Sequence, residues 1–329
     1  MSAEGGTKAI IAALAANAGI AVSKFVAFVF TGSSSMLAES IHSVADSGNQ
    51  ALLLLGGKRS KRARTQQHQF GYGRERYFYA FVVAVVLFTV GAVFSLYEGY
   101  HKISHPEEIT SAGWAFGVLT AAIIMEIFSF RTAIKESNQV RGDKSWWEFI
   151  RRSKAPELPV VLLEDLAALI GLFLALFGVS MAVATGDGVW DGVGTVAIGL
   201  LLAVVAIILA IETKSLLIGE GADADLERRL VEALESGEQV DHVVHIRTQY
   251  MGPEELLIAA KIAVDHDDTA ADVARGIDAA EERIRALCPE ATLIYLEPAL
   301  SETVAASVPA PAQSPEAEAA SDPENPASS

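Results

Sequence analysis

One polar segment reads Ser35-Met-Leu-Ala-Glu-Ser-Ile-His42-Ser-Val-Ala-Asp46-Ser-Gly-Asn-Gln50. It continues into an apolar run, and the two together reach membrane-spanning length, so this segment predicts a membrane protein. His42 and Asp46 are four residues apart, so a helix places them on one face, one turn apart. Glu39 lies on the same side, and Asn49 and Gln50 extend the polar stripe. Ionisable groups at bilayer depth are costly, so we expect them to face a cavity or a partner.

An imidazole and a carboxylate on one helix face supply two ligands of the kind that suits Zn²⁺, and also Mn²⁺, Fe²⁺ or Co²⁺. The alternative is a polar interface between helices. Such interfaces usually rely on Ser, Thr or Asn rather than on a charged carboxylate. The pair therefore favours a metal site inside a membrane domain.

Six apolar runs have the length of transmembrane helices. They span about Lys8–Phe30, Met36–Leu55, Tyr77–Tyr97, Trp114–Phe130, Leu158–Ala182 and Val193–Ile211. The link between the first two is so short that they should form a helical hairpin. With 51% hydrophobic residues in 329, the composition suits a membrane domain joined to a soluble one. The first run lacks the pattern of a cleaved signal peptide, and we expect it to be a retained span.

Basic residues predict the orientation of these spans. They concentrate in the link from the second to the third run and in the link from the fourth to the fifth, whereas the other links carry Lys102 or none. Such links face the cytoplasm, so both termini are expected there. Topology explains these basic segments better than nucleic-acid binding does.

The fifth run contains adjacent carboxylates, Glu164 and Asp165, with apolar residues on both sides. Neighbours on a helix point about 100° apart, so one can face a cavity while the other contacts a different helix. The alternative places both at the membrane surface. We expect at least one to be a ligand or proton carrier. The sequence leaves open the roles of Lys24 in the first run and Glu126 in the fourth, where Glu126 is an interfacial carboxylate beside Arg131 or takes part in transport.

The chain after the sixth run is acidic and has the pattern of a small soluble domain. We expect a helix over Ala222–Ser236, strands over Val240–Tyr250 and Glu255–Val264, a helix over Thr269–Leu287 and a strand over Ala291–Leu296. The order αββαβ predicts an α+β domain with helices on one face of its sheet. We place a membrane domain at residues 1–215, the soluble domain at 216–300 and a disordered tail at 301–329.

Other function classes find little support. A single cysteine, Cys288, excludes an internal disulfide and any cysteine-cluster metal site, and we expect it to be a buried apolar side chain. Phe70-Gly-Tyr-Gly-Arg74 precedes a membrane span rather than following a strand, so it is not typical of a nucleotide loop. No nucleophile–base spacing or zinc-protease motif appears, and we expect that the protein is not an enzyme.

Four motifs together resemble the cation diffusion facilitator family of divalent-metal transporters. They are the segment from Gly32 to Gln50, Phe70-Gly-Tyr-Gly-Arg-Glu-Arg76, Tyr97-Glu-Gly-Tyr-His-Lys-Ile-Ser-His-Pro106 and Lys214-Ser-Leu-Leu-Ile-Gly-Glu-Gly221. The resemblance covers about Lys8 to Pro298. It implies a homodimer in the lipid bilayer, six spans per subunit, a cytoplasmic ferredoxin-like domain, and efflux of Zn²⁺ or a similar ion in exchange for protons, with no permanently bound cofactor.

In that family a tetrahedral site takes two ligands from the second span and two from a His/Asp-x-x-x-Asp motif in the fifth. His42 and Asp46 match the two ligand positions of the second span, but the fifth span differs from the family motif. If Asp165 takes the motif's Asp, Val161 stands at the other position; if Glu164 takes the first position, Ala168 stands at the second. Zinc-transporter members with a Leu-Glu-Asp fifth span look most similar. The resemblance therefore implies a site of His42, Asp46 and Asp165, with Glu164 fourth.

The soluble domain also departs from the family pattern. Family members with regulatory zinc there use histidines at positions that match Val244, Lys261 and Tyr295 here. We therefore interpret this domain as a dimerisation module. Because the fifth-span motif is incomplete, the alternative function is a non-transporting metal-binding or regulatory membrane partner that retains the fold. The expected location is a bacterial plasma membrane, with an organelle membrane as the alternative.

Overall fold

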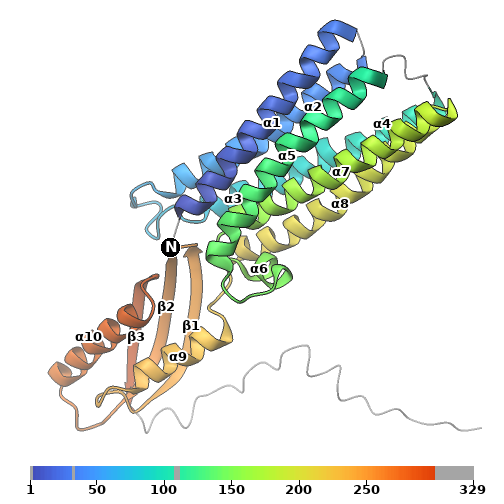
Figure 1. Ribbon diagram of the computed structural model, residues 1–329. Helices are drawn as coiled ribbons and strands as arrows, with labels where there is room; N and C mark the ends of the chain where they lie inside the picture. Colours follow the sequence, from blue (N-terminus) through green and yellow to red (C-terminus); the bar gives the residue numbers. More distant parts are fainter. Residues whose placement is uncertain (1–2, 32–33, 107–111, 301–329) are drawn as a thin grey trace, which may run out of the picture. The chain divides into compact units, whose positions relative to one another are not determined.

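The computed structural model describes residues 3–31, 34–106 and 112–300 (Figure 1). Within those ranges it describes the backbone but not the side chains of residues 3–5, 27, 28, 30, 31, 34–39, 41 and 42. The predicted disordered tail from Ser301 lies outside the described residues.

Long helices coincide with all six predicted spans, which confirms the expected helical membrane domain. They are α1 (Ala3–Thr31), α2 (Ser34–Ser60), the continuous segment formed by α3 (Glu75–Val86), the π-helix η1 (Leu87–Val93) and α4 (Phe94–Ser104), then α5 (Ala112–Arg141), α7 (Glu157–Thr185) and α8 (Val189–Ile218). Among the described residues, five of these segments are long and apolar enough to cross a bilayer. The sixth, α2, has 27 residues, a length of about 40 Å, and carries the polar stripe.

Close packing of the helices depends on small residues at two contacts. A Cβ atom added to Gly99 of α4 would lie 2.7 Å from the backbone nitrogen of Val196 in α8, and one added to Gly178 of α7 would lie 2.9 Å from the carbonyl oxygen of Trp190. In lipid, helices associate through van der Waals contact, and small residues allow their backbones to approach. These glycines therefore hold α4 and α7 against α8.

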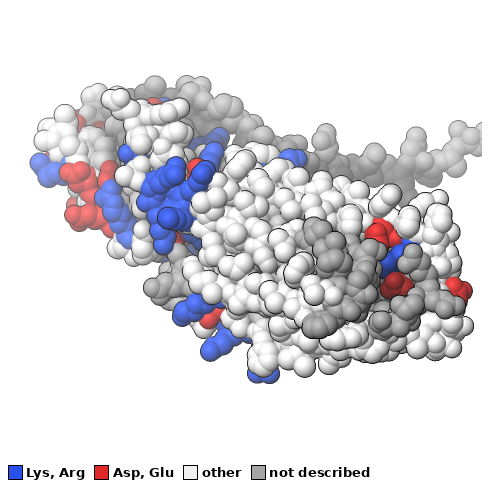
Figure 2. Space-filling model, turned by 90° about the horizontal axis from the view of Figure 1, so that it is seen from above, with Lys and Arg blue, Asp and Glu red and all other residues white. Residues whose placement is uncertain are grey.

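Large apolar side chains cover much of the outer surface of the helices. On the face seen in Figure 2, charged residues are few over the helical unit. Phe128 of α5, Phe177 of α7 and Val204 of α8 are more than half exposed. Such a surface would be unfavourable in water and suits contact with lipid chains. Charged side chains inside such a helical bundle are unfavourable unless a partner or a bound ion offsets the loss of hydration.

An ion pair between α3 and α7 lies at one end of the bundle. The Arg76 guanidinium donates to both carboxylate oxygens of Glu157, with 2.9 Å between Nη2 and Oε2. Both side chains are largely buried. A two-bonded guanidinium–carboxylate pair has fixed geometry, so it sets the register of α3 against α7 just before Glu164 and Asp165.

The C-terminal region forms the predicted αββαβ arrangement. Its elements are α9 (Ala224–Glu235), β1 (His242–Gly252), β2 (Glu255–Val264), α10 (Ala270–Leu287) and β3 (Ala291–Leu300), with sheet order β1-β2-β3. A capping box between Thr269 and Asp272 begins α10, because each side chain accepts from the other's backbone N–H. Cys288 follows α10 and is buried, as expected, and burial raises the pKa of its thiol.

The chain divides into two compact units. A helical unit contains the chain up to Ala222 together with residues 249–257, and a C-terminal unit contains α9, the rest of β1 and β2, α10 and β3. A separate apolar core of Val240, Ile262 and Val264 packs with Val273 and Ile277 in the C-terminal unit.

Candidate metal site

The polar stripe of α2 points into the helical unit. Asp46 is half-buried, and the side chains of Asn49 and Gln50 are buried completely or almost so. His42 lies on α2 one turn before Asp46, but its side chain is outside those that the structure describes. The shared site of His42 and Asp46 therefore stays a prediction.

Two amides from α2 hold the carboxylate of Glu164 on α7. Asn49 Nδ2 donates to Glu164 Oε1 and Gln50 Nε2 donates to Oε2, each at 2.8 Å. Gln50 in turn accepts from Asn17 Nδ2 of α1 at 3.3 Å. This buried chain of hydrogen bonds joins α1, α2 and α7, and both oxygens of Glu164 are engaged in it.

Asp165 faces a different helix from its neighbour Glu164. Its Oδ2 accepts from Ser129 Oγ of α5 at 2.6 Å, and the residue is 2% exposed. The two carboxylates thus diverge as helix geometry requires, one toward α2 and the other toward α5. Both side chains are buried among the helices.

Three further carboxylates and one lysine act electrostatically on Glu126 of α5. These groups are Asp165, Asp46, Glu164 and Lys24. Lys24 of α1 is 8% exposed. These groups come from α1, α2, α5 and α7, so four helices contribute ionisable residues to one region of the bundle.

The predicted ligand set includes one side chain, the imidazole of His42, that the structure does not describe. The described side chains include no group of three or more His, Cys, Asp or Glu residues that lie close enough together to hold an ion. The imidazole of His42 is not among these described side chains. The assignment of His42, Asp46, Asp165 and Glu164 therefore remains a prediction.

In the C-terminal unit, the second-strand position that matches a zinc-binding histidine holds Lys261, whose Nζ lies 3.0 Å from Glu297 Oε1. His242 contacts its neighbour Asp241, with 3.0 Å between Nδ1 and Oδ2. The described residues of this unit bring no metal-binding cluster together. Lys261 and His242 each lie beside a carboxylate in an ordinary surface charge pair.

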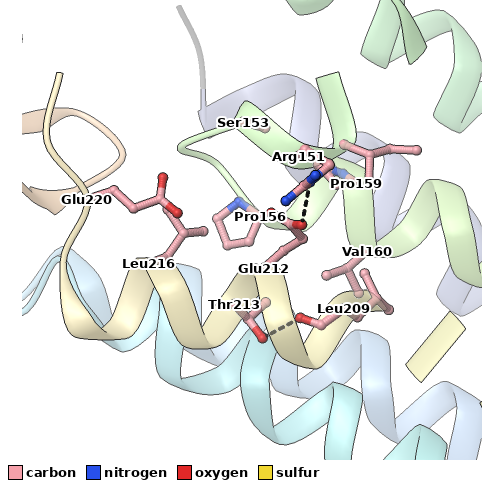
Figure 3. A pocket seen from close by; sticks show the side chains of 11 residues that line it. Arg151, Ser153, Pro156, Pro159, Val160, Leu209, Glu212, Thr213, Leu216 and Glu220 are labelled. Atoms are coloured by element: carbon pink, nitrogen blue, oxygen red, sulfur yellow. Dashed lines mark hydrogen bonds and ion pairs between the residues drawn. The ribbon is translucent and has the colours of Figure 1, made fainter. Parts of the chain in front are cut away.

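A pocket between α7, α8 and the segment before α7 lies apart from these carboxylates (Figure 3). Pro156, Pro159 and Leu216 line it, and the Arg151 Nε–Glu212 Oε1 hydrogen bond of 3.1 Å crosses it. It contains none of the four predicted ligands. We therefore place the candidate site among the buried carboxylates.

Two hydrogen-bonded contacts of the site could not be predicted from the sequence. Ser129 is a common polar residue in an apolar helix, and its bond to Asp165 has no signal in the sequence. The chain from Asn17 through Gln50 to Glu164 joins residues up to 147 positions apart (17 to 164). The polar stripe of α2 indicated that Asn49 and Gln50 face inward, but not which group they bind.

Taken together, the lipid-facing exterior, the buried carboxylates and the αββαβ unit define a membrane protein of the transporter class. Residues 10–218 match the model of the cation efflux transmembrane domain, and residues 222–299 match that of the cation efflux protein cytoplasmic domain. The chain belongs to this family, the cation diffusion facilitators.

Similar proteins include zinc antiporters. The chain is 33% identical over 268 residues to the proton-coupled zinc antiporter SLC30A9, mitochondrial, of Xenopus laevis, which covers 80% of this chain and 48% of that protein. The human protein of the same name is 30% identical over 264 residues, covering 80% and 46%. This chain thus spans about half the length of these relatives. A solved structure of a MamM-CTD variant with two substitutions is 24% identical over 23% of this chain and 90% of its own, with a TM-score of 0.22.

Proposed function

We propose that this protein exports a divalent metal cation, with Zn²⁺ as the first choice and Mn²⁺, Fe²⁺ or Co²⁺ as alternatives, in exchange for protons. His42 and Asp46 of α2 and Asp165 of α7 are the proposed ligands, with Glu164 as the fourth candidate. The metal is cargo, and the protein is not an enzyme. The observation that carries the proposal is the buried pair Glu164 and Asp165, which face two different helices inside a bundle with a lipid-facing exterior.

Burial supports a site for a cation rather than a purely structural role. A buried carboxylate is costly unless it is paired or binds a metal. Asn49 and Gln50 donate to both oxygens of Glu164, whereas Ser129 donates to one oxygen of Asp165. In this proposal the other oxygen of Asp165 binds the cation. Carboxylate oxygen and neutral imidazole nitrogen are both ligands for Zn²⁺.

Proton exchange follows from the chemistry of these ligands. Metal binding needs ionised carboxylates and a neutral imidazole, so metal and protons compete for the same groups. A conformational change that exposes the site to an acidic side would then release the metal. The names of the SLC30A9 relatives, which are proton-coupled zinc antiporters, support this coupling.

Orientation and assembly belong to the same proposal. The basic links after α2 and after α5 would face the cytoplasm, and the αββαβ unit would lie there too. The match of this unit to a cytoplasmic domain model supports that placement, and we propose that it joins two subunits in a homodimer. The membrane is that of a bacterium or of an organelle; the SLC30A9 relatives carry the word mitochondrial in their names.

The test is metal-driven proton flux in proteoliposomes that contain the purified protein. His42→Ala and Asp46→Ala should each abolish the flux. Asp278→Asn on α10 is the matched control, because Asp278 is an exposed carboxylate and the change should leave the flux intact. Full flux in either α2 variant would defeat the assignment.

A second candidate function is a metal-binding or regulatory partner that does not transport. The observation that favours it is Val161, which occupies a ligand position of the family motif and is a fully buried apolar side chain. Under this alternative the purified protein would bind Zn²⁺ but show no metal counterflow. Counterflow in the unmodified protein excludes it.

A further inference from the structure

The segment that joins α5 to α7 is basic, although the chain as a whole is acidic. Residues 141–154, called the basic segment below, contain five cationic side chains and two carboxylates, a net charge of +3 in a chain of net charge −16. The cations are Arg141, Lys144, Arg151, Arg152 and Lys154, and the carboxylates are Asp143 and Glu148. Positive charge gathered in one place on an acidic chain favours an anionic partner there.

The basic segment is held at the end of the helical unit where α5 ends and α7 begins (Figure 1). It contains the short helix α6 (Trp146–Arg152), which begins at Ser145, whose side chain accepts from the backbone N–H of Glu148. Phe149 of α6 is 3% exposed and belongs to the same apolar core as Leu209 of α8. The segment is therefore packed against the bundle rather than hanging from it as a loose loop.

The lengths of the flanking helices place the basic segment at the level of lipid headgroups. α5 has 30 residues and α7 has 29, so each is about 44 Å long, whereas the hydrocarbon core of a bilayer is about 30 Å thick. A centred helix of this length extends about 7 Å past the core on each side. The residues between the end of α5 and the start of α7 then lie beside the phosphates.

Two exposed tryptophans begin α6, and each has an arginine beside its ring. Trp146 is 39% exposed and Trp147 is 56% exposed. Arg141 Cζ lies 4.6 Å from the centroid of the Trp146 ring, and Arg151 Cζ lies 5.9 Å from that of Trp147. Tryptophan is enriched where a membrane meets water, because its ring is apolar and its N–H is polar. The segment thus presents rings for the acyl-chain boundary and guanidinium groups for phosphate.

The ion pairs of the segment leave its arginines accessible. Arg151 Nε donates to Glu212 of α8 at 3.1 Å and Arg152 Nη1 donates to Glu148 at 3.2 Å, yet these arginine side chains are 55% and 67% exposed. Lys144 is exposed as well. A guanidinium has five N–H donors in a fork that fits phosphate oxygens in pairs. Because exposed ion pairs are weak, a phosphate can compete with these carboxylates.

We propose that the basic segment binds the headgroups of anionic phospholipids in the adjoining leaflet. Trp146 and Trp147 lie at the boundary of the acyl chains, while Lys144, Arg151 and Arg152 contact the phosphates. The inference adds a lipid partner to a segment that holds none of the proposed metal ligands. It does not depend on metal transport or on which side of the membrane is cytoplasmic.

Lipid binding to the purified full-length protein, measured by native mass spectrometry, tests the charge of this surface. Phosphatidylglycerol should bind more tightly than the neutral phosphatidylcholine. The double variant Lys144→Gln/Arg152→Gln should weaken phosphatidylglycerol binding by about fivefold for each charge removed and leave phosphatidylcholine binding unchanged. Equal affinity of the unmodified protein for the two lipids, or an unchanged affinity in the double variant, overturns the proposal.

Arg228→Gln/Arg285→Gln is the matched control, because it removes two exposed positive charges from the C-terminal unit. It should leave phosphatidylglycerol binding intact, and an equal loss in this control would show that overall charge, not the basic segment, attracts the lipid. Inorganic phosphate at the concentration of the lipid should not displace phosphatidylglycerol. Displacement would show a site for free anions and would overturn the lipid assignment.

Tryptophan fluorescence in phosphatidylglycerol nanodiscs tests the depth of the segment without changing its charge. The emission of Trp146 and Trp147 is the difference between the unmodified protein and Trp146→Phe/Trp147→Phe, since Trp114 and Trp190 contribute to both. Lipids brominated near the headgroup should quench this difference more strongly than lipids brominated at the chain end. No quenching by either lipid would place the segment away from the bilayer and overturn the proposal.

Discussion

In the helical unit, Glu126, Glu157, Glu164 and Asp165 are buried between helices, whereas in the described part of the C-terminal unit no charged side chain is buried. The C-terminal unit is rich in carboxylates, and several of them pair with nearby cations, as Glu281 does with Arg285 on α10 at 2.6 Å. Exposed pairs of this kind contribute little to stability.

The two units differ in how the negative charge of a carboxylate is stabilised. On the surface, water solvates the charge, so a substitution should be nearly neutral. Between lipid-embedded helices, each charge needs hydrogen bonds, a counter-ion or a bound cation to offset its desolvation. Glu157 has Arg76, Glu164 has two amides, and Asp165 has the hydroxyl of Ser129.

The largest contrast is expected in transport. Asp165→Asn should lower metal-driven proton flux in proteoliposomes by at least tenfold, because it removes an anionic oxygen from the proposed site. Asp278→Asn makes the same chemical change on α10 and should leave the flux unchanged. Equal flux in the two variants would show that a buried carboxylate of the helical unit matters no more for transport than an exposed one of the C-terminal unit.

A large contrast is also expected in stability. Glu157→Gln leaves the Arg76 guanidinium buried without its counter-ion and should destabilise the helical unit by about 3–5 kcal/mol. Glu281→Gln breaks the exposed pair with Arg285 and should cost less than about 1 kcal/mol. Thermal unfolding in one detergent measures both, and similar midpoints would show that burial does not matter here.

Glu164→Gln should produce an intermediate effect. The new amide cannot accept from both Asn49 and Gln50, so one hydrogen bond to a charged group is lost, which typically costs about 1.5–3 kcal/mol. Flux should fall less than in Asp165→Asn when it is normalised to folded protein. The reverse ranking would make Glu164 the primary ligand on α7.

The capping box of α10 should show a smaller effect. Thr269→Ala removes the hydroxyl that accepts from the Asp272 backbone N–H and should cost about 1 kcal/mol. Amide hydrogen exchange in the first turn of α10 should accelerate, while metal flux stays normal. Unchanged exchange would show that the cap does not stabilise this helix.

The smallest expected effect concerns pH. Hydrogen bonds from Thr269 lower the pKa of the exposed Asp272 carboxyl below its usual value. A lowered folded-state pKa contributes stability that is present above the unfolded-state pKa and is lost as the pH falls through the folded-state value. The first turn of α10 should therefore loosen in acid, and Asp272→Asn should flatten that dependence in hydrogen exchange.

Local patterns were sufficient to predict most of the fold. Apolar runs predicted the spans, and alternation with turn residues such as Gly252 and Pro253 predicted the strands. Glu164 and Asp165 were predicted to point in different directions, because adjacent residues on a helix always do. The partners of these residues were not predictable, since Ser129 precedes Asp165 by 36 residues and the apolar residues around it carry no pairing signal.

The six spans, the αββαβ order and the presence of costly charges inside the membrane segments follow from the amino-acid sequence, because periodicity and hydrophobicity are properties of each segment alone. The partners of these charges depend on how the helices pack. Asn49 and Gln50 of α2 reach Glu164, and Ser129 of α5 reaches Asp165, only when these helices come together with α7. Packing of whole helices sets these contacts, and no single segment encodes it.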